Sequence, residues 1–238
     1  MSEPPTNDDN ERFQKAMEWI SRLRKEPFNL ETEEKLAKHP FLKAAEADTL
    51  TPETRFSVKK IPTTPDVPLP PKYKSYDDLF QFLLGGEIYA ANLLLDHANY
   101  LGLEGGEEAI RKGKSLSPLA QGYPSYWARL ALNNQRAAGA AACAVNFPAW
   151  GRMCQGLLAA FQKHNADKCT KEDLDKGLAF IQFFATPIEN LDEMAAAVIM
   201  HSMGPSDVCS YEDVATHVRL LQEYEVLFWD ACYSESDL

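Results

Sequence analysis

Runs of apolar residues at helical spacing constrain the fold of this chain more than any other feature. Phe13, Met17 and Ile20 recur three or four residues apart, and similar runs follow along the chain. No segment alternates convincingly between apolar and polar residues, and 12 glycines are few for a sheet protein of 238 residues. The pattern predicts an all-α bundle. The expected helices span 13–23, 32–48, 76–103, 107–112, 126–134, 137–163, 171–184, 191–203 and 211–233.

The chain is long enough to bury one substantial core. We expect residues 1–34 to form a leader with one extra helix, and residues 35–238 to form a single helical domain. Residues 61–71 hold five of the 15 prolines, which favours an extended strap. From its place before the helix 76–103, we expect this strap to cover or border a cavity mouth.

Charge and cysteine content narrow the partners and the compartment. Lys and Arg number 24 against 35 Asp and Glu, and a net charge of -11 disfavours nucleic acid and anionic membranes. Five cysteines without a Cys-x-x-Cys pair signal neither a disulfide framework nor a zinc site. The first residues lack a signal-peptide pattern, and no run approaches the length of a membrane span. We therefore expect a cytoplasmic protein.

Two glutamates fall on apolar helix faces. Glu225 lies amid the apolar arc of the last helix, and Glu87 lies on a face with Phe80, Leu83 and Leu84. A buried carboxylate either finds partners or shifts its pKa upward and becomes a candidate acid or base. Two such residues in a bundle predict either a shared carboxylate-lined pocket or separate structural hydrogen bonds, and the spacing does not decide between them.

Aromatic residues suggest a ligand site beside a helix kink. Pro148 interrupts a helical pattern between Phe147 and Trp150, and Tyr123 and Tyr126 form a second aromatic group. Such rings suit a flat, partly polar ligand, although they also serve as ordinary core residues.

Sequence motifs argue against several enzyme classes. The chain has no G-x-S-x-G, P-loop, H-E-x-x-H or G-x-G-x-x-G motif. Leu94 stands one heptad after Glu87, where a di-metal bundle would need a histidine. We therefore expect no metal ligands and no cofactor.

Four segments carry a family resemblance: His39-Pro40-Phe41-Leu42, Tyr123-Pro124-Ser125-Tyr126, Asn146-Phe147-Pro148-Ala149-Trp150 and Glu223-Tyr224-Glu225-x-x-Phe228-Trp229-Asp230. With them, residues 35–235 resemble the TenA/Thi-4/PqqC family. The resemblance implies a haem-oxygenase-like helical bundle with a central cavity, assembled as a homodimer or homotetramer. It also implies C–N bond hydrolysis of thiamine or aminopyrimidine compounds, as in thiaminase II.

Carried over by position, the resemblance makes Glu225 the catalytic residue and Tyr123 a pocket residue. The remaining expected ligand-binding residues are Glu87, Tyr126, Phe147, Trp150 and Phe228. Pro148 stands where the family has its nucleophilic cysteine, and Ser57-Val58-Lys59-Lys60 stands where the family has an aspartate-bearing helix. Cys154 is a candidate for a displaced thiol, against the alternative of a buried structural cysteine.

Three functions follow. The first is an enzyme acting on a small heteroaromatic compound, with Glu225 as acid or base. The second is a non-catalytic protein that binds a small ligand or a partner. The third is oxygen or metal chemistry through Glu87 and Glu225, and the family resemblance adds a cofactorless oxidase resembling PqqC.

Overall fold

The computed structural model describes residues 7–49, 78–98, 108, 118–168, 170–203 and 209–234, and within them it contains helices and no strand. The predicted all-α fold is confirmed. The helices are α1 (Asn7–Leu23), α2 (Pro27–Ala37), α3 (Pro40–Glu46), α4 (Asp78–Ala98), α6 (Pro118–Leu132), α7 (Arg136–Asn165), α8 (Lys171–Gly177), α9 (Ala179–Ala185), α10 (Leu191–Ser202) and α11 (Tyr211–Ser234).

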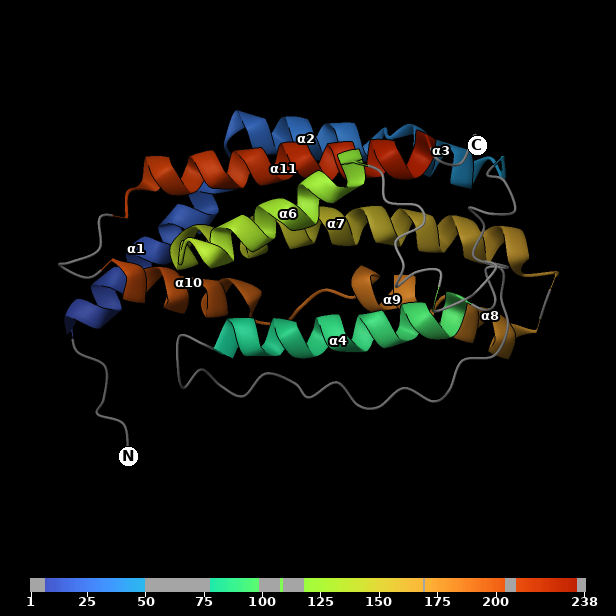
Figure 1. Cartoon of the computed structure of the whole chain (residues 1–238), viewed down its shortest axis with the longest axis horizontal. Helices are drawn as coiled ribbons and strands as arrows, with labels where there is room; N and C mark the ends of the chain where they lie inside the picture. The colour runs from blue at the N-terminus through green and yellow to red at the C-terminus, as the bar shows by residue number, and fades with distance from the viewer. Residues whose placement is uncertain are drawn as a thin grey trace.

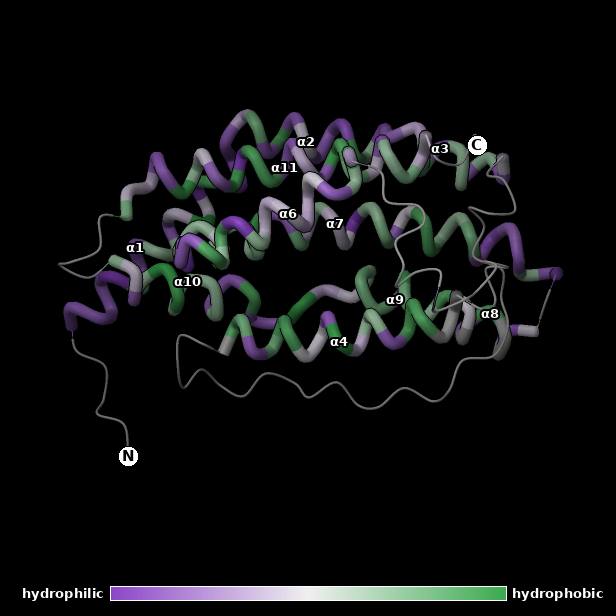
Figure 2. Tube along the Cα trace, in the orientation of Figure 1, coloured by the Kyte–Doolittle hydropathy of each residue, from purple (hydrophilic) through white to green (hydrophobic). Residues whose placement is uncertain are grey.

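Helix α7 forms the centre of the bundle. It runs through the middle of Figure 1, with α2, α3 and α11 on one side and α9 and α10 on the other. Helix α6 packs against α7 and α11, and α4 lies beyond α9 and α10. Helices α2 and α11 alternate between hydrophilic and hydrophobic residues along their length (Figure 2), as expected of helices with one exposed face.

The alanine-rich sequence of α7 explains its central position. Residues 137–146 of this helix are all buried, and most of them are alanine. Small side chains let neighbouring helices approach closely. One core cluster surrounds this half of α7, and a second surrounds its other half, where Met153, Leu157 and Phe161 pack against α3 and α9.

Two predicted helices are each split in the structure. The run 32–48 divides into α2 and α3, because Pro40 begins α3 and forces His39 before it into an extended conformation. The His39 ring accepts a hydrogen bond from the Phe41 N–H and contacts Asp230 at 3.1 Å, which ties this break to α11. The run 171–184 divides at Leu178 into α8 and α9.

The buried face of α4 differs from the predicted one. Leu79, Gly86, Ala90 and Leu93 are buried, whereas Leu84 and Glu87 are exposed. The helix is thus rotated by about one residue from the expected orientation. Its small residues face α9, where a Cβ at Gly86 would lie 3.4 Å from the Phe183 ring.

The N-terminal helix belongs to the main packing. Ala16, Ile20 and Leu23 of α1 are buried in the first core cluster, and α1 packs against α10. The proposed domain boundary at residue 34 stays a prediction. The proline strap and the expected helix at 107–112, apart from Glu108, lie outside the described residues. None of the described helices has the length and apolarity needed to cross a membrane.

Two helical glycines should respond oppositely to alanine. A Cβ at Gly85 would meet nothing within 4 Å, whereas one at Gly122 would lie 2.9 Å from the Tyr224 ring. Gly85→Ala should therefore raise the free energy of unfolding by about 0.5–1 kcal/mol through helix propensity. Gly122→Ala should lower it by about 1–3 kcal/mol through overpacking. Urea unfolding measures both, and a stabilised Gly122→Ala variant would contradict the close contact of α6 with α11.

Candidate functional site

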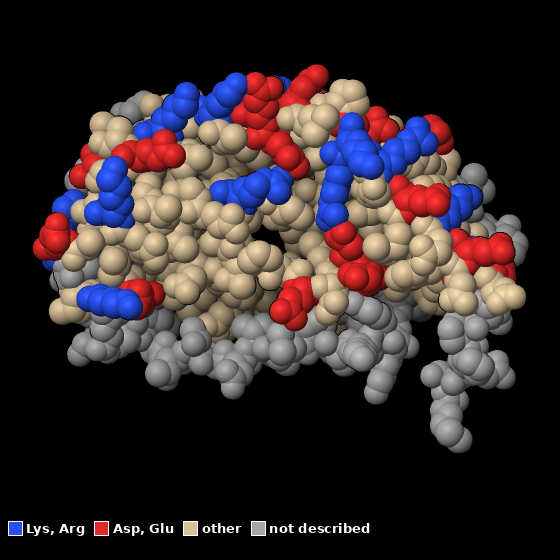
Figure 3. All heavy atoms as spheres, turned by 180° about the vertical axis from the view of Figure 1, so that it is seen from behind, with Lys and Arg blue, Asp and Glu red and all other residues tan. Residues whose placement is uncertain are grey.

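A large cavity lies among α4, α6, α7 and α9. Its volume is about 1460 Å³, larger than the roughly 300–1,000 Å³ of most small-molecule sites. It borders α7 from Gln135 to Gln155, a length of about 30 Å at 1.5 Å per residue. A deep opening interrupts the protein surface in the space-filling view (Figure 3). The cavity can therefore hold an elongated molecule.

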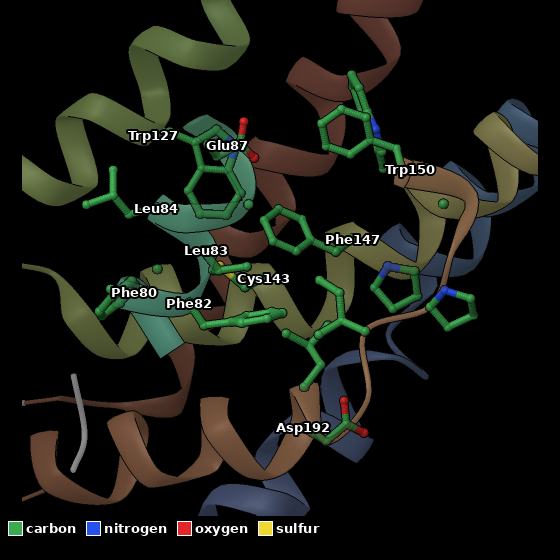
Figure 4. Close-up of a pocket in the computed structure, with 18 of the residues that line it drawn as sticks. Phe80, Phe82, Leu83, Leu84, Glu87, Trp127, Cys143, Phe147, Trp150 and Asp192 are labelled. Atoms are coloured by element: carbon green, nitrogen blue, oxygen red, sulfur yellow. The ribbon is translucent and has the colours of Figure 1, made fainter. Parts of the chain in front are cut away.

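Aromatic and aliphatic side chains dominate the cavity wall. Figure 4 shows side chains from α4, α6 and α7 converging on the space between these helices. Helix α9 and the segment after it close another side. The apolar wall residues include Phe80, Phe82, Leu83, Leu84, Trp127, Leu130, Cys143, Phe147, Trp150, Phe183, Phe184 and Ile188.

Pro148 shapes the wall through the hydrogen bond that it cannot make. A proline inside a helix has no N–H for the carbonyl four residues earlier, here that of Ala144. The guanidinium of Arg24, directly after the end of α1, donates to this carbonyl at 2.7 Å. The same guanidinium binds both carboxylate oxygens of Asp192 on α10, at 2.6 and 2.5 Å. Arg24 and Asp192 border the cavity. The Ala144 carbonyl, which Pro148 leaves without a helical partner, is therefore hydrogen-bonded at the cavity wall.

A buried polar chain begins at the cavity wall and crosses the core. The Tyr123 hydroxyl donates to the Asn146 side-chain carbonyl. The Asn146 amide donates to Gln222 at 2.6 Å and to Glu225 at 2.5 Å. Gln222 then donates to Asn29 on α2. Asn146, Gln222, Glu225 and Asn29 are all 0% exposed, so this chain satisfies polar groups that water cannot reach.

Burial controls the ionisation of Glu225. Removal from water raises the pKa of its carboxyl group to about 8, although hydrogen bonds from Trp229 and Asn146 act in the opposite direction. The Trp229 indole N–H donates to Glu225 at 3.3 Å. Glu225 is therefore mostly protonated at neutral pH. It does not border the cavity, because Tyr123 and Asn146 stand between them.

The structure gathers most of the predicted aromatic residues. Tyr123, Phe147 and Trp150 border the cavity. The Tyr123 and Trp150 rings stack with centroids 5.7 Å apart and planes 3° apart. Phe228 packs against both rings, at 5.9 and 5.3 Å, but does not border the cavity. Trp127 adds a further wall ring, 5.9 Å from Phe147.

Tyr126 lies away from this group. Its hydroxyl contacts the His217 ring on α11 at 2.6 Å, and Arg129 donates to the same oxygen at 3.3 Å. Burial lowers the pKa of His217 and raises that of Tyr126. Tyr126 does not border the cavity, so its contacts join α6 to α11 and do not supply a cavity wall.

The two predicted glutamates do not share a pocket. Glu87 borders the cavity from α4 (Figure 4), whereas Glu225 lies behind Tyr123 and Asn146 and does not border it. The predicted inward face of α4 is wrong for Glu87, since the side chain is exposed. Even so, partial desolvation at the cavity raises the pKa of its carboxyl group.

Cys143 and Cys154 are poor nucleophiles in this arrangement. Burial raises the pKa of Cys143, which borders the cavity, and of Cys154, which does not. Both therefore hold neutral thiols at pH 7, whereas the nucleophilic form is the thiolate. Among the described residues, no three His, Cys, Asp or Glu side chains gather as metal ligands.

Sequence reasoning missed Asn146 as a functional candidate, along with Arg24 and the cavity-lining Phe183 and Phe184 of α9. The sequence did carry a signal for Asn146, because this polar residue directly follows nine small or aliphatic residues, all of which are buried. Arg24 carried no local signal, because its partners lie 120 and 168 positions away. Two further wall residues have buried polar atoms without a hydrogen-bond partner, Trp150 at Nε1 and Gln135 at Oε1.

Comparison with known proteins found no matching family model, no matching curated protein and no matching solved structure. The TenA/Thi-4/PqqC resemblance and the haem-oxygenase-like topology therefore stay predictions.

The raised pKa of Glu225 predicts a pH-dependent stability. Below pH 4.5, its ordinary pKa, the folded and unfolded states both hold the proton; up to about pH 8 only the folded state does. Each pH unit in this window should therefore lower the free energy of unfolding by about 1.4 kcal/mol. Glu225→Gln removes the titration. The stability of Glu225→Gln relative to the unchanged protein should then rise steadily from pH 5 to pH 8.

Urea unfolding at several pH values measures this slope. Glu223→Gln changes an exposed residue of the same helix and should retain the slope, because Glu225 is still present. Parallel stability profiles for Glu225→Gln and the unchanged protein would show that Glu225 is not the titrating group.

Proposed function

We propose that this protein binds a flat, largely apolar small molecule, such as a heteroaromatic compound, in the cavity among α4, α6, α7 and α9. The observation that supports this function is an aromatic-walled cavity of about 1460 Å³ in a small protein. Close-packed interiors leave few voids larger than a water molecule. A space of this size is therefore more readily explained by an occupant than by imperfect packing.

The ring arrangement favours a flat occupant. The Tyr123 and Trp150 rings are stacked with nearly parallel planes, while the Trp127 and Phe147 planes differ by 48°. Rings at mixed angles offer a planar molecule both stacked and edge-to-face contacts. The Tyr123 hydroxyl donates its proton to Asn146 and accepts a hydrogen bond from the Trp127 side chain, so these two wall rings are held in place.

Binding is favoured over catalysis by the state of the candidate reactive groups. The cavity-facing thiol of Cys143 is protonated, and Glu225 has no direct access to the cavity. A hydrolase needs a nucleophile or an activated water next to the scissile bond. Binding without catalysis needs neither a nucleophile nor an activated water at the cavity, so it agrees better with the groups that line it.

A second candidate is C–N hydrolysis of a heteroaromatic compound, as the family resemblance implies. The supporting observation is the Tyr123–Asn146–Glu225 connection, which links the cavity wall to a protonated carboxylic acid. Incubation with thiamine and with an aminomethylpyrimidine, followed by mass spectrometry, tests it. Release of the alcohol product by the unchanged protein and its loss in Tyr123→Phe would support hydrolysis, while intact compounds would exclude it for these substrates.

The oligomeric state and the location belong to the same proposal. The resemblance implies a homodimer or homotetramer, and the composition favours the cytoplasm. Leu84 and Ile88 on α4 are 61% and 56% exposed, which supplies apolar surface for self-association. Light scattering of the purified protein tests the first point.

Filling the cavity should abolish binding of an apolar probe. Gly139 borders the cavity, and a Cβ there would lie 3.9 Å from Phe80. Gly139→Leu should therefore fold normally and place its larger side chain in the cavity. We expect the unchanged protein to enhance the fluorescence of N-phenyl-1-naphthylamine, and Gly139→Leu to weaken this binding at least tenfold.

Gly85→Leu is the matched control, since Gly85 does not border the cavity and has open space around it. It should bind the probe like the unchanged protein, and thermal unfolding confirms that both variants are folded. Equal probe binding by Gly139→Leu would place the probe outside this cavity and remove the support for the proposed function.

A further inference from the structure

The arginines around the cavity are already engaged. Arg24 forms its two-pronged pair with Asp192, and Arg152 contacts Glu33 at 2.6 Å. Arg136 donates to the Asn134 side chain at 3.0 Å. Each of these three arginines therefore already has a polar partner.

Several carboxylates around the cavity are in the opposite situation. Glu87, Glu189 and Glu193 border the cavity, and none of them has a basic partner within the part of the chain that the structure describes. The pKa of Glu87 is raised by desolvation, with no cation acting against it. The cavity is lined by four acidic side chains, Glu87, Glu189, Asp192 and Glu193, against three basic ones, so the balance of charge around it is negative.

Glu87 also lies near the aromatic wall of the cavity. The charge of Glu87 acts on the pKa of both Tyr123 and Cys143, so its carboxylate lies within electrostatic range of the cavity wall that α6 and α7 form. The face of an aromatic ring attracts a cation, most strongly when the ring is an indole. A carboxylate near such rings completes the surroundings that an ammonium group prefers.

We propose that the ligand of this cavity is an organic cation, whose aromatic or alkyl body fills the aromatic space while its ammonium group lies at Glu87. This inference rests on the proposed function, since it specifies the class of molecule that the cavity binds. Gln135 also lines the cavity, and among the described residues its buried Oε1 has no hydrogen-bond partner, so it can receive an N–H donor.

Three probes of one shape test the charge preference. They are (2-naphthylmethyl)trimethylammonium, the neutral 2-naphthylmethanol and the anionic 2-naphthylacetate, each titrated by calorimetry at moderate salt. We expect the ammonium probe to bind at least tenfold more tightly than the anion, with the neutral probe between them. Glu87→Gln should weaken the ammonium probe at least fivefold and leave the neutral probe unchanged.

Glu18→Gln is the control for the overall negative charge. Glu18 is exposed on α1 and does not border the cavity, so this variant makes the same charge change elsewhere and should leave all three affinities unchanged. Equal loss of ammonium binding in both variants would overturn the role of Glu87. Binding of all three probes with equal affinity would overturn the cation preference and leave the proposed function standing, whereas absence of binding by any probe would reject both.

Discussion

The side-chain amide of Asn146 is the interaction on which the centre of this structure depends. It accepts from Tyr123 on α6 and donates to Gln222 and Glu225 on α11, and Gln222 extends the link to α2. Both amide hydrogens and the carbonyl are thereby used. Because every partner except Tyr123 is fully buried, the loss of this one group would leave several polar atoms unsatisfied, each at a cost of about 1–3 kcal/mol.

Arg24 plays a comparable part at the other wall of the cavity. Pro148 leaves the carbonyl of Ala144 without its helical partner, and Arg24 occupies that carbonyl while holding Asp192. Arg24, which follows the end of α1, thus connects this end of α1 to α7 and α10. Both hydrogen-bond systems include a residue of α7. One uses the side chain of Asn146, two residues before Pro148, and the other uses the carbonyl of Ala144, four residues before Pro148. The cavity wall is therefore held from both the α11 side and the α10 side.

The sequence predicted most helices because each has a strong apolar period, and it predicted the burial of Glu225 for the same reason. It failed on α4, where Phe80, Phe82, Leu83 and Leu84 place large apolar groups on several faces and make the arc ambiguous. The structure buries the small residues Gly86 and Ala90 instead, since they allow close approach to α9. The aromatic site was recognisable from Tyr123, Phe147 and Trp150. The polar chain was not, because its members are separated by up to 193 positions.

Helix α4 supplies a large share of the cavity wall, yet its main contacts among the described helices are with α9 and α10 alone. Helix α7, by contrast, serves both core clusters as well as the wall. Substitutions at the exposed cavity-lining positions of α4, Leu84 and Glu87, can therefore change the cavity without disturbing the buried residues of this helix. Because the residues that contact a ligand and the residues that hold the core lie largely on different helices, the ligand specificity of this fold can change during evolution through substitutions on α4.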